Sequence, residues 1–230
     1  MADNFFEGKR LYKLGRYRQA LFEFLKVSEE PLEDTNLSYY VGLCYSKISD
    51  WDNALLYLES IVNSDDNILR IYQGRMILSY IYTITGRSKL AEFELNKLIN
   101  DGFESPQVYS NYSYIYFENG NTDKSVEYLR KALEIDPNNA NAMNSLGYIL
   151  AEKEIDLEMA LEYCKKALKH NPDSAAYLDS LGWAYYRVGK NDESRHYLKR
   201  AFDASPDNKL IALHLRTVID KIDEIRKGSL

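Results

Sequence analysis

The chain has 230 residues, 45% of them hydrophobic, and a formal net charge of −6. That apolar share is enough for a packed core and excludes a disordered chain, and the few prolines (5) and glycines (11) favour helices over strands. The acidic balance, with a pI near 5.3, argues against nucleic acid as a partner, because phosphates require a dense field of lysine and arginine.

Aromatic residues are unusually frequent, with 20 tyrosines, 8 phenylalanines and 2 tryptophans. Tyrosine combines an apolar ring with a hydroxyl group and so tolerates a half-exposed position. An excess of tyrosine therefore predicts an exposed interaction surface rather than an ordinary core.

No apolar stretch reaches the length of a membrane span, and the first residues lack the basic and apolar regions of a signal peptide. We expect no membrane insertion by this chain. The expected compartment is the cytoplasm; the periplasm or a membrane anchor is the alternative if an N-terminal signal has been removed.

A unit of about 34 residues repeats along the chain from its first residues. Gly8 and Ala20 recur as Gly42 and Ala54. Later units are marked in chain order by Gly86, Ala91, Gly120, Ser125, Gly147, Ala160, Gly182 and Ser194. Apolar residues within each unit follow helical spacing, so each unit predicts two helices. We place the units at residues 1–34, 35–68, 69–104, 105–138, 139–173 and 174–207.

The small residues have a physical role at these positions. Two helices of one unit can cross closely only where side chains are small, and the apolar face of one pair is buried only when neighbouring pairs stack on it. Pro137, Pro172 and Pro206 end units, because proline disfavours helix in the residue before it. One-sided apolar spacing after Pro206 predicts a capping helix over residues 208–228.

These residues resemble the tetratricopeptide-repeat family, whose unit has small residues at positions 8 and 20 and a proline near its end. The match is most specific in the last three units, for example over Leu133–Pro137 and Leu181–Tyr185. The resemblance implies an all-α fold: a right-handed α-solenoid of about six helix hairpins plus a C-terminal capping helix, forming one domain over residues 1–230. The later units look like those of bacterial adaptor and assembly proteins, including envelope lipoproteins.

The family also implies where a ligand binds, because the first helix of each unit lines a concave groove. Carried over position by position, this predicts a groove for a protein or peptide that is rich in aromatic side chains. The predicted groove residues are Phe5, Lys9, Tyr12, Lys13, Tyr39, Leu43, Lys47, Tyr80, Tyr114, Phe117, Asn144, Tyr148, Trp183, Tyr186 and Arg187. Lys9, Lys13 and Lys47 make the early groove basic, whereas Glu118, Glu152 and Asp179 make its later part acidic.

Amide side chains are the polar candidates in this groove. Asn36, Gln73, Gln107, Asn141 and Asn144 fall where an amide can donate to and accept from a peptide backbone, and Asn144 is the favoured one. The family's carboxylate clamp for chaperone tails is missing, because its positions hold Phe5, Lys9, Tyr40, Gln73 and Ile77.

We find no catalytic constellation, metal-ligand spacing or phosphate loop, so we expect neither an enzyme nor a cofactor. His170, His196 and His214 fall outside the groove and are interpreted as surface residues. The sequence therefore predicts a scaffold or adaptor that binds a peptide, loop or helix, as a monomer or weak oligomer. Two alternatives stay open: a structural subunit that associates end to end or with itself, and a non-catalytic fragment of a larger enzyme or envelope lipoprotein.

Overall fold

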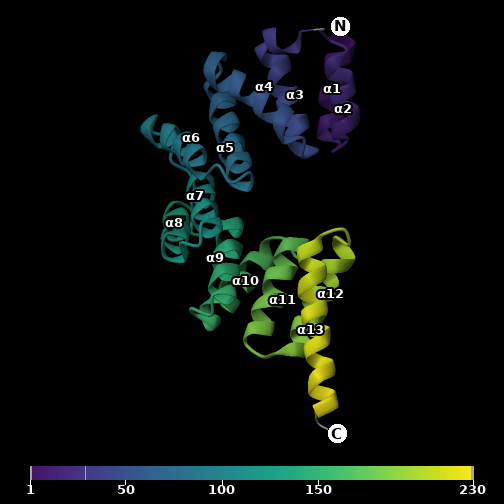
Figure 1. Ribbon diagram of the computed structural model, residues 1–230, viewed down its shortest axis with the longest axis vertical. Coiled ribbons are helices and arrows are strands. Elements are labelled where there is room, and N and C mark those ends of the chain that lie inside the picture. The colour runs from purple at the N-terminus through teal and green to yellow at the C-terminus, as the bar shows by residue number, and fades with distance from the viewer. Residues whose placement is uncertain (1, 29, 229–230) are drawn as a thin grey trace. The chain divides into compact units, whose positions relative to one another are not determined.

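The computed structural model describes residues 2–28 and 30–228, and every long regular element in these ranges is an α-helix (Figure 1). The chain divides into two compact units, Met1–Glu104 (unit 1) and Ser105–Leu230 (unit 2). The predicted all-α fold is thus confirmed, whereas a single domain over residues 1–230 stays a prediction.

Unit 1 contains three helix hairpins. Its elements are α1 (Ala2–Lys13), α2 (Tyr17–Leu25), the short 3-10 helix η1 (Pro31–Glu33), α3 (Thr35–Lys47), α4 (Trp51–Ser64), α5 (Ile68–Ile84) and α6 (Ser88–Asn100). Consecutive helices pack against each other, and the first helices of neighbouring hairpins, α1 with α3 and α3 with α5, are also in contact.

Unit 2 contains three further hairpins and a long last helix. Its elements are α7 (Pro106–Glu118), α8 (Thr122–Ile135), α9 (Ala140–Glu152), α10 (Leu157–His170), α11 (Ala175–Arg187), α12 (Asn191–Ala204) and α13 (Lys209–Gly228). The last helix packs on both α11 and α12, so it occupies the place that the first helix of another hairpin would take.

The turn of each hairpin has the same geometry because the same backbone hydrogen bond closes it. The carbonyl groups that accept it belong to Leu11, Tyr45, Tyr82, Tyr116, Leu150 and Tyr185, and each lies 2.7 to 3.0 Å from the amide nitrogen five residues later. The residue before that amide has a positive φ, which glycine adopts without strain, as at Gly120 (74°). Ser49 and Glu154 take the same position with φ of 62° and 52°.

Polar side chains at the helix starts fix where the helices begin. Asp34, Asp50, Asn67, Ser105, Asn121, Asn139, Asp156, Ser174 and Asn208 each accept a hydrogen bond from backbone N–H groups of the first turn. Those N–H groups have no partner within the helix, so each cap stabilises its helix by about 1 kcal/mol.

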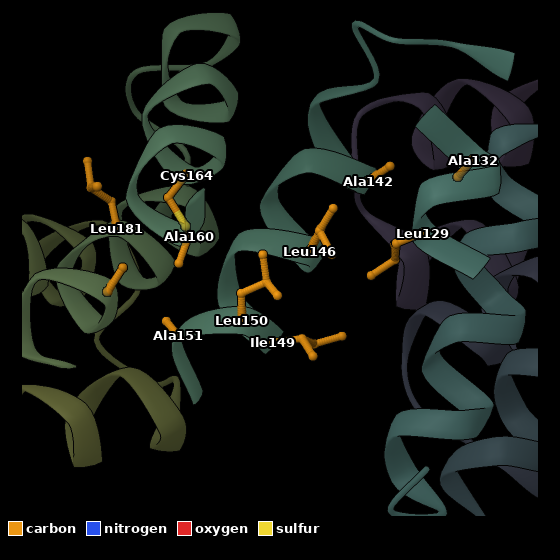
Figure 2. Close-up of a cluster of buried hydrophobic side chains, with 11 residues drawn as sticks. Leu129, Ala132, Ala142, Leu146, Ile149, Leu150, Ala151, Ala160, Cys164 and Leu181 are labelled. Atoms are coloured by element: carbon orange, nitrogen blue, oxygen red, sulfur yellow. The ribbon is translucent and has the colours of Figure 1, made fainter. Parts of the chain in front are cut away.

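The core of unit 2 lies between its stacked hairpins. Leu129 of α8, Leu146 and Leu150 of α9, Cys164 of α10 and Leu181 of α11 are at most 1% exposed and belong to one cluster (Figure 2). Each buried leucine stabilises the fold by roughly 1.5 to 3 kcal/mol. Cys164 therefore serves packing.

Unit 1 has its own core. It contains Leu11, Ala20, Leu21, Phe24, Leu37, Val41, Cys44 and Tyr57, which come from the first two hairpins. Unit 1 and unit 2 thus each bury a separate set of side chains, and each cluster lies within its own unit.

Candidate functional site

In unit 1 the predicted groove residues of α1 gather around Tyr40. The ring of Phe5 lies 5.6 Å from the ring of Tyr40, and the ring of Tyr12 lies 6.4 Å from it. The Nζ atom of Lys9 sits over the rings of both Phe5 and Tyr40, at 5.6 and 5.1 Å. Burial raises the pKa of Tyr12 to about 12. These rings therefore pack on one another and are only partly available to a ligand.

Other residues of unit 1 that were predicted to contact a ligand instead bond to neighbouring hairpins. The hydroxyl group of Tyr39 donates to Gln73 Oε1, and Arg70 donates to Asn36 Oδ1 at 3.2 Å. Leu43 is only 3% exposed, because α3 has first helices on both sides. Its expected place in the groove is therefore wrong. Tyr80 (45% exposed), Lys13 and Lys47 remain on the surface.

Unit 2 holds a cavity of about 270 Å³ among its first helices and the start of α13. The lining residues are Ser110, Ser113, Tyr114, Phe117, Asn144, Ser145, Tyr148, Ile149, Ala176, Asp179, Ser180, Asn208, Leu210 and Ile211. We call this the unit 2 cavity. It brings together four predicted groove residues, Tyr114, Phe117, Asn144 and Tyr148, and small side chains leave the space between them.

Asn144 supplies the most informative polar atom of the unit 2 cavity. Its Oδ1 atom is buried and has no hydrogen-bond partner within the described structure. A buried acceptor without a donor costs about 1 to 3 kcal/mol, so this position is unfavourable unless something donates to it. The neighbouring amide on α9, Asn141, differs: its Oδ1 accepts from the Tyr177 hydroxyl group at 2.5 Å.

Aromatic rings form one side of the unit 2 cavity. The rings of Phe117 and Tyr148 lie 6.3 Å apart, nearly perpendicular to each other. Burial raises the pKa of Tyr148 to about 12, and the carboxylates of Glu152, Asp179 and Glu118 add to that rise. The Tyr148 hydroxyl group therefore stays protonated at neutral pH and faces a region of negative potential.

The last helix, α13, covers the C-terminal end of the predicted groove. His214 of α13 is 4% exposed, so its interpretation as a surface residue is wrong. Its Nδ1 atom lies 2.9 Å from Asp179 Oδ1, and its ring stacks on Trp183 at 4.1 Å. His170 and His196 are exposed, as predicted.

Trp183 is consequently closed to a ligand, and Asp179, which lines the unit 2 cavity, has its carboxylate paired with His214. Trp183 is 8% exposed, and its Nε1 atom donates to Glu152 Oε2 at 2.8 Å. The expected groove position of Trp183 is therefore wrong, because α13 covers the ring. Tyr186 packs on Trp183 with ring centres 5.0 Å apart, and Arg187 pairs with Glu154 at 2.5 Å.

Sequence reasoning missed the contribution of α13 to the unit 2 cavity. Asn208, Leu210 and Ile211 line it, and Leu210 is 47% exposed. The predicted cap does bury Ile211, Val218 and Ile222, at 2%, 0% and 8% exposure. The available signal was the 35-residue spacing between Asp179 and His214, which is close to one repeat.

Neither a metal-binding cluster nor a membrane-spanning helix occurs among the described residues. No group of three or more histidine, cysteine, aspartate or glutamate side chains within them is arranged to hold a metal ion. None of the described helices combines the length and apolar character that a bilayer span requires.

Comparison with known proteins agrees with the fold of helix hairpins. Residues 114–153 match the TPR repeat family and residues 174–205 match the tetratricopeptide repeat. Among solved structures, a tetratricopeptide repeat protein from Parabacteroides merdae is similar to this chain, with a TM-score of 0.78 and 12% sequence identity. The superposition covers 92% of this chain and 81% of that protein. These findings define a protein built from helical hairpin repeats. Residues 114–153 and 174–205 are matched as tetratricopeptide repeats, and the chain has the fold of tetratricopeptide-repeat structures.

Two more structures share the fold. The Cut9–Hcn1 assembly of APC/C covers 92% of this chain, with 41% of that chain covered, a TM-score of 0.74 and 13% identity. YrrB, described as a TPR protein with an unusual peptide-binding site, covers 84% of this chain, with 97% of YrrB covered, a TM-score of 0.51 and 22% identity.

A curated relative is human protein O-mannosyl-transferase TMTC1, which is 29% identical over 157 residues, or 66% of this chain. The match spans only 17% of the length of that protein.

Proposed function

We propose that the chain is a non-catalytic adaptor that binds a peptide, loop or helix of a partner protein in the unit 2 cavity. The observation that carries the proposal is the buried, unpartnered Asn144 Oδ1 atom among the side chains of Tyr114 and Tyr148. An amide beside aromatic rings suits a polypeptide, which offers both N–H donors and apolar side chains.

The fold supports this proposal. Tyr114 lies on α7, which contacts α9, and α9 carries Asn144 and Tyr148 about one helical turn apart. The packed helices hold these side chains in place, so little order has to be gained on binding. Tetratricopeptide-repeat structures are similar to this chain, and one of them is described as having a peptide-binding site.

The proposal is tested by site-specific photo-crosslinking in the native cell. A photoreactive phenylalanine in place of Tyr114 or Tyr148 is expected to form adducts with a partner, and mass spectrometry then locates one short segment of that partner. Tyr163 on the second helix α10 lies outside the cavity lining and is the matched control position. Equal adducts from the control position, or none from Tyr114 and Tyr148, would contradict binding in the unit 2 cavity.

A further inference from the structure

We infer that the ligand of the unit 2 cavity is an internal peptide segment that inserts an uncharged aliphatic or aromatic side chain and carries lysine or arginine beside it. This inference rests on the proposed function and names the chemical class of its ligand. It excludes acidic segments and free chain ends.

The lining of the unit 2 cavity is apolar or neutral except for one residue. Tyr114, Phe117, Tyr148, Ile149, Leu210 and Ile211 supply its apolar surface. The only charged lining residue is Asp179, and its carboxylate is already paired with His214. An inserted apolar side chain gains about 25 cal/mol for each Å² removed from water, whereas a carboxylate would be buried without a cation.

Asn144 defines how the main chain of the ligand is held. Its buried Oδ1 atom requires a donor, and a peptide N–H group is the donor that every residue of a ligand except proline provides. The N–H group lies next to the side chain on the same residue. A segment that donates to Asn144 therefore places a side chain against the neighbouring rings of the cavity.

The charges around the unit 2 cavity disfavour an acidic ligand. The first helices α7, α9 and α11 carry Glu118, Glu152 and Asp179 and no lysine. Their single cation, Arg187, is paired with Glu154. The same three carboxylates add to the rise in the pKa of Tyr148, whose main cause is burial. Lys209 begins α13 but does not line the cavity, whereas Lys153, directly after α9, places its Nζ atom 5.5 Å from the centre of the Phe117 ring. The three carboxylates outnumber this one lysine, so the balance stays negative.

The same charges separate an internal segment from a chain end. A terminal carboxylate at the cavity would need a lysine or arginine among its lining residues, and there is none. Exposed Glu118 lies one residue beyond Phe117 and offers a partner for a basic residue of the ligand. Such a rim contact contributes mainly to specificity and to the rate of association.

Two random dodecapeptide phage libraries, selected against the full chain, test this inference. One displays the peptides internally and the other displays them with free C-termini. We expect the internal library to yield binders with one fixed aliphatic or aromatic position, few acidic residues and an excess of lysine and arginine. A selected peptide, synthesised with acetylated and amidated ends, is the probe for affinity measurements.

Variants of the chain then locate the binding. Asn144→Ala and Tyr148→Ala are each expected to weaken binding of the capped peptide about tenfold, as expected for a lost buried hydrogen bond or ring contact. Asn141→Ala, an amide on the same helix outside the cavity lining, is expected to bind within about a factor of two of wild type. Circular dichroism establishes that each variant is folded.

The outcomes distinguish a wrong ligand class from a wrong proposed function. Selected peptides that are acidic or need a free carboxylate, yet lose affinity in Asn144→Ala and Tyr148→Ala, would overturn the ligand class and leave the proposed function in place. If neither library yields a peptide that is sensitive to these two variants, the proposed function fails as well.

Discussion

At the scale of single residues, glycines decide how closely the helices of a hairpin approach. A Cβ atom on Gly147 would lie 2.6 Å from Cys164 Sγ and 2.9 Å from the carbonyl oxygen of Ala160. For a Cβ atom on Gly42 the three nearest atoms all belong to side chains, those of Leu58 and Tyr57, at 3.2 Å. The first contact includes backbone, which cannot move away as readily as a flexible side chain.

Gly147→Ala is therefore expected to destabilise unit 2. Overpacking costs about 1 to 3 kcal/mol and outweighs the gain of up to about 1 kcal/mol from the helix propensity of alanine. We expect a net loss of about 1 to 2 kcal/mol in the free energy of unfolding, measured with urea and circular dichroism. Gly42→Ala is the comparison and should be nearly neutral; an equal loss in both variants would show that the backbone contact is not the cause.

At the scale of elements, α13 does more than end the stack. It covers the core through Ile211 and Val218, lines the unit 2 cavity through Leu210, and fixes its own position through the buried pair of His214 and Asp179. Each side chain of that pair is at most 7% exposed. Removing one member leaves the other buried without its partner.

We expect His214→Ala to lower the free energy of unfolding of unit 2 by about 3 kcal/mol, because Asp179 then keeps an uncompensated buried charge. Urea unfolding followed by tryptophan fluorescence measures the loss, since the His214 ring stacks on Trp183.

Two further variants control this experiment. The double variant Asp179→Leu and His214→Leu should be more stable than His214→Ala, because both polar groups are removed together. Leu213→Ala, on the same helix but 57% exposed, should change stability by less than about 0.5 kcal/mol. A loss in His214→Ala as small as in Leu213→Ala would refute the importance of the buried pair.

At the scale of the whole molecule, the two units differ in the charge of their first helices, and the cavity lies in unit 2. The predicted basic groove residues Lys9, Lys13 and Lys47 all lie in unit 1, whereas the acidic first helices and the cavity belong to unit 2. The cavity lining runs from Ser110 to Ile211, entirely within unit 2.

A fragment of residues 105–230 should therefore fold and bind without unit 1. The clusters around Leu146, Leu178 and Leu198 are built from helices of this unit. We expect cooperative thermal unfolding by circular dichroism and an affinity for the selected capped peptide within about a factor of two of the full chain. A fragment without a cooperative transition would instead favour the single domain over residues 1–230 that the repeat pattern predicts.

Much of the fold could be predicted because its determinants are local or strictly periodic. The crossing residues Gly147 and Ala160 are fully buried or tightly packed, and caps such as Asn139 begin the helices. The same periodicity groups Tyr114, Asn144 and Tyr148, which line one cavity; their role in binding stays a prediction. Trp183 and Leu43 occupy equivalent positions in their repeats but are only 8% and 3% exposed.

The sequence by itself determined the repeat, the helix hairpins and the small residues at their crossings, because each depends on spacing within about 34 residues. Only the tertiary structure decided which side chains of the first helices stay open. Trp183 reaches Glu152, Asp179 reaches His214, and Tyr39 reaches Gln73 across neighbouring hairpins. Those contacts depend on how the hairpins stack, and they remove some predicted ligand contacts while leaving the Asn144 Oδ1 atom without a partner.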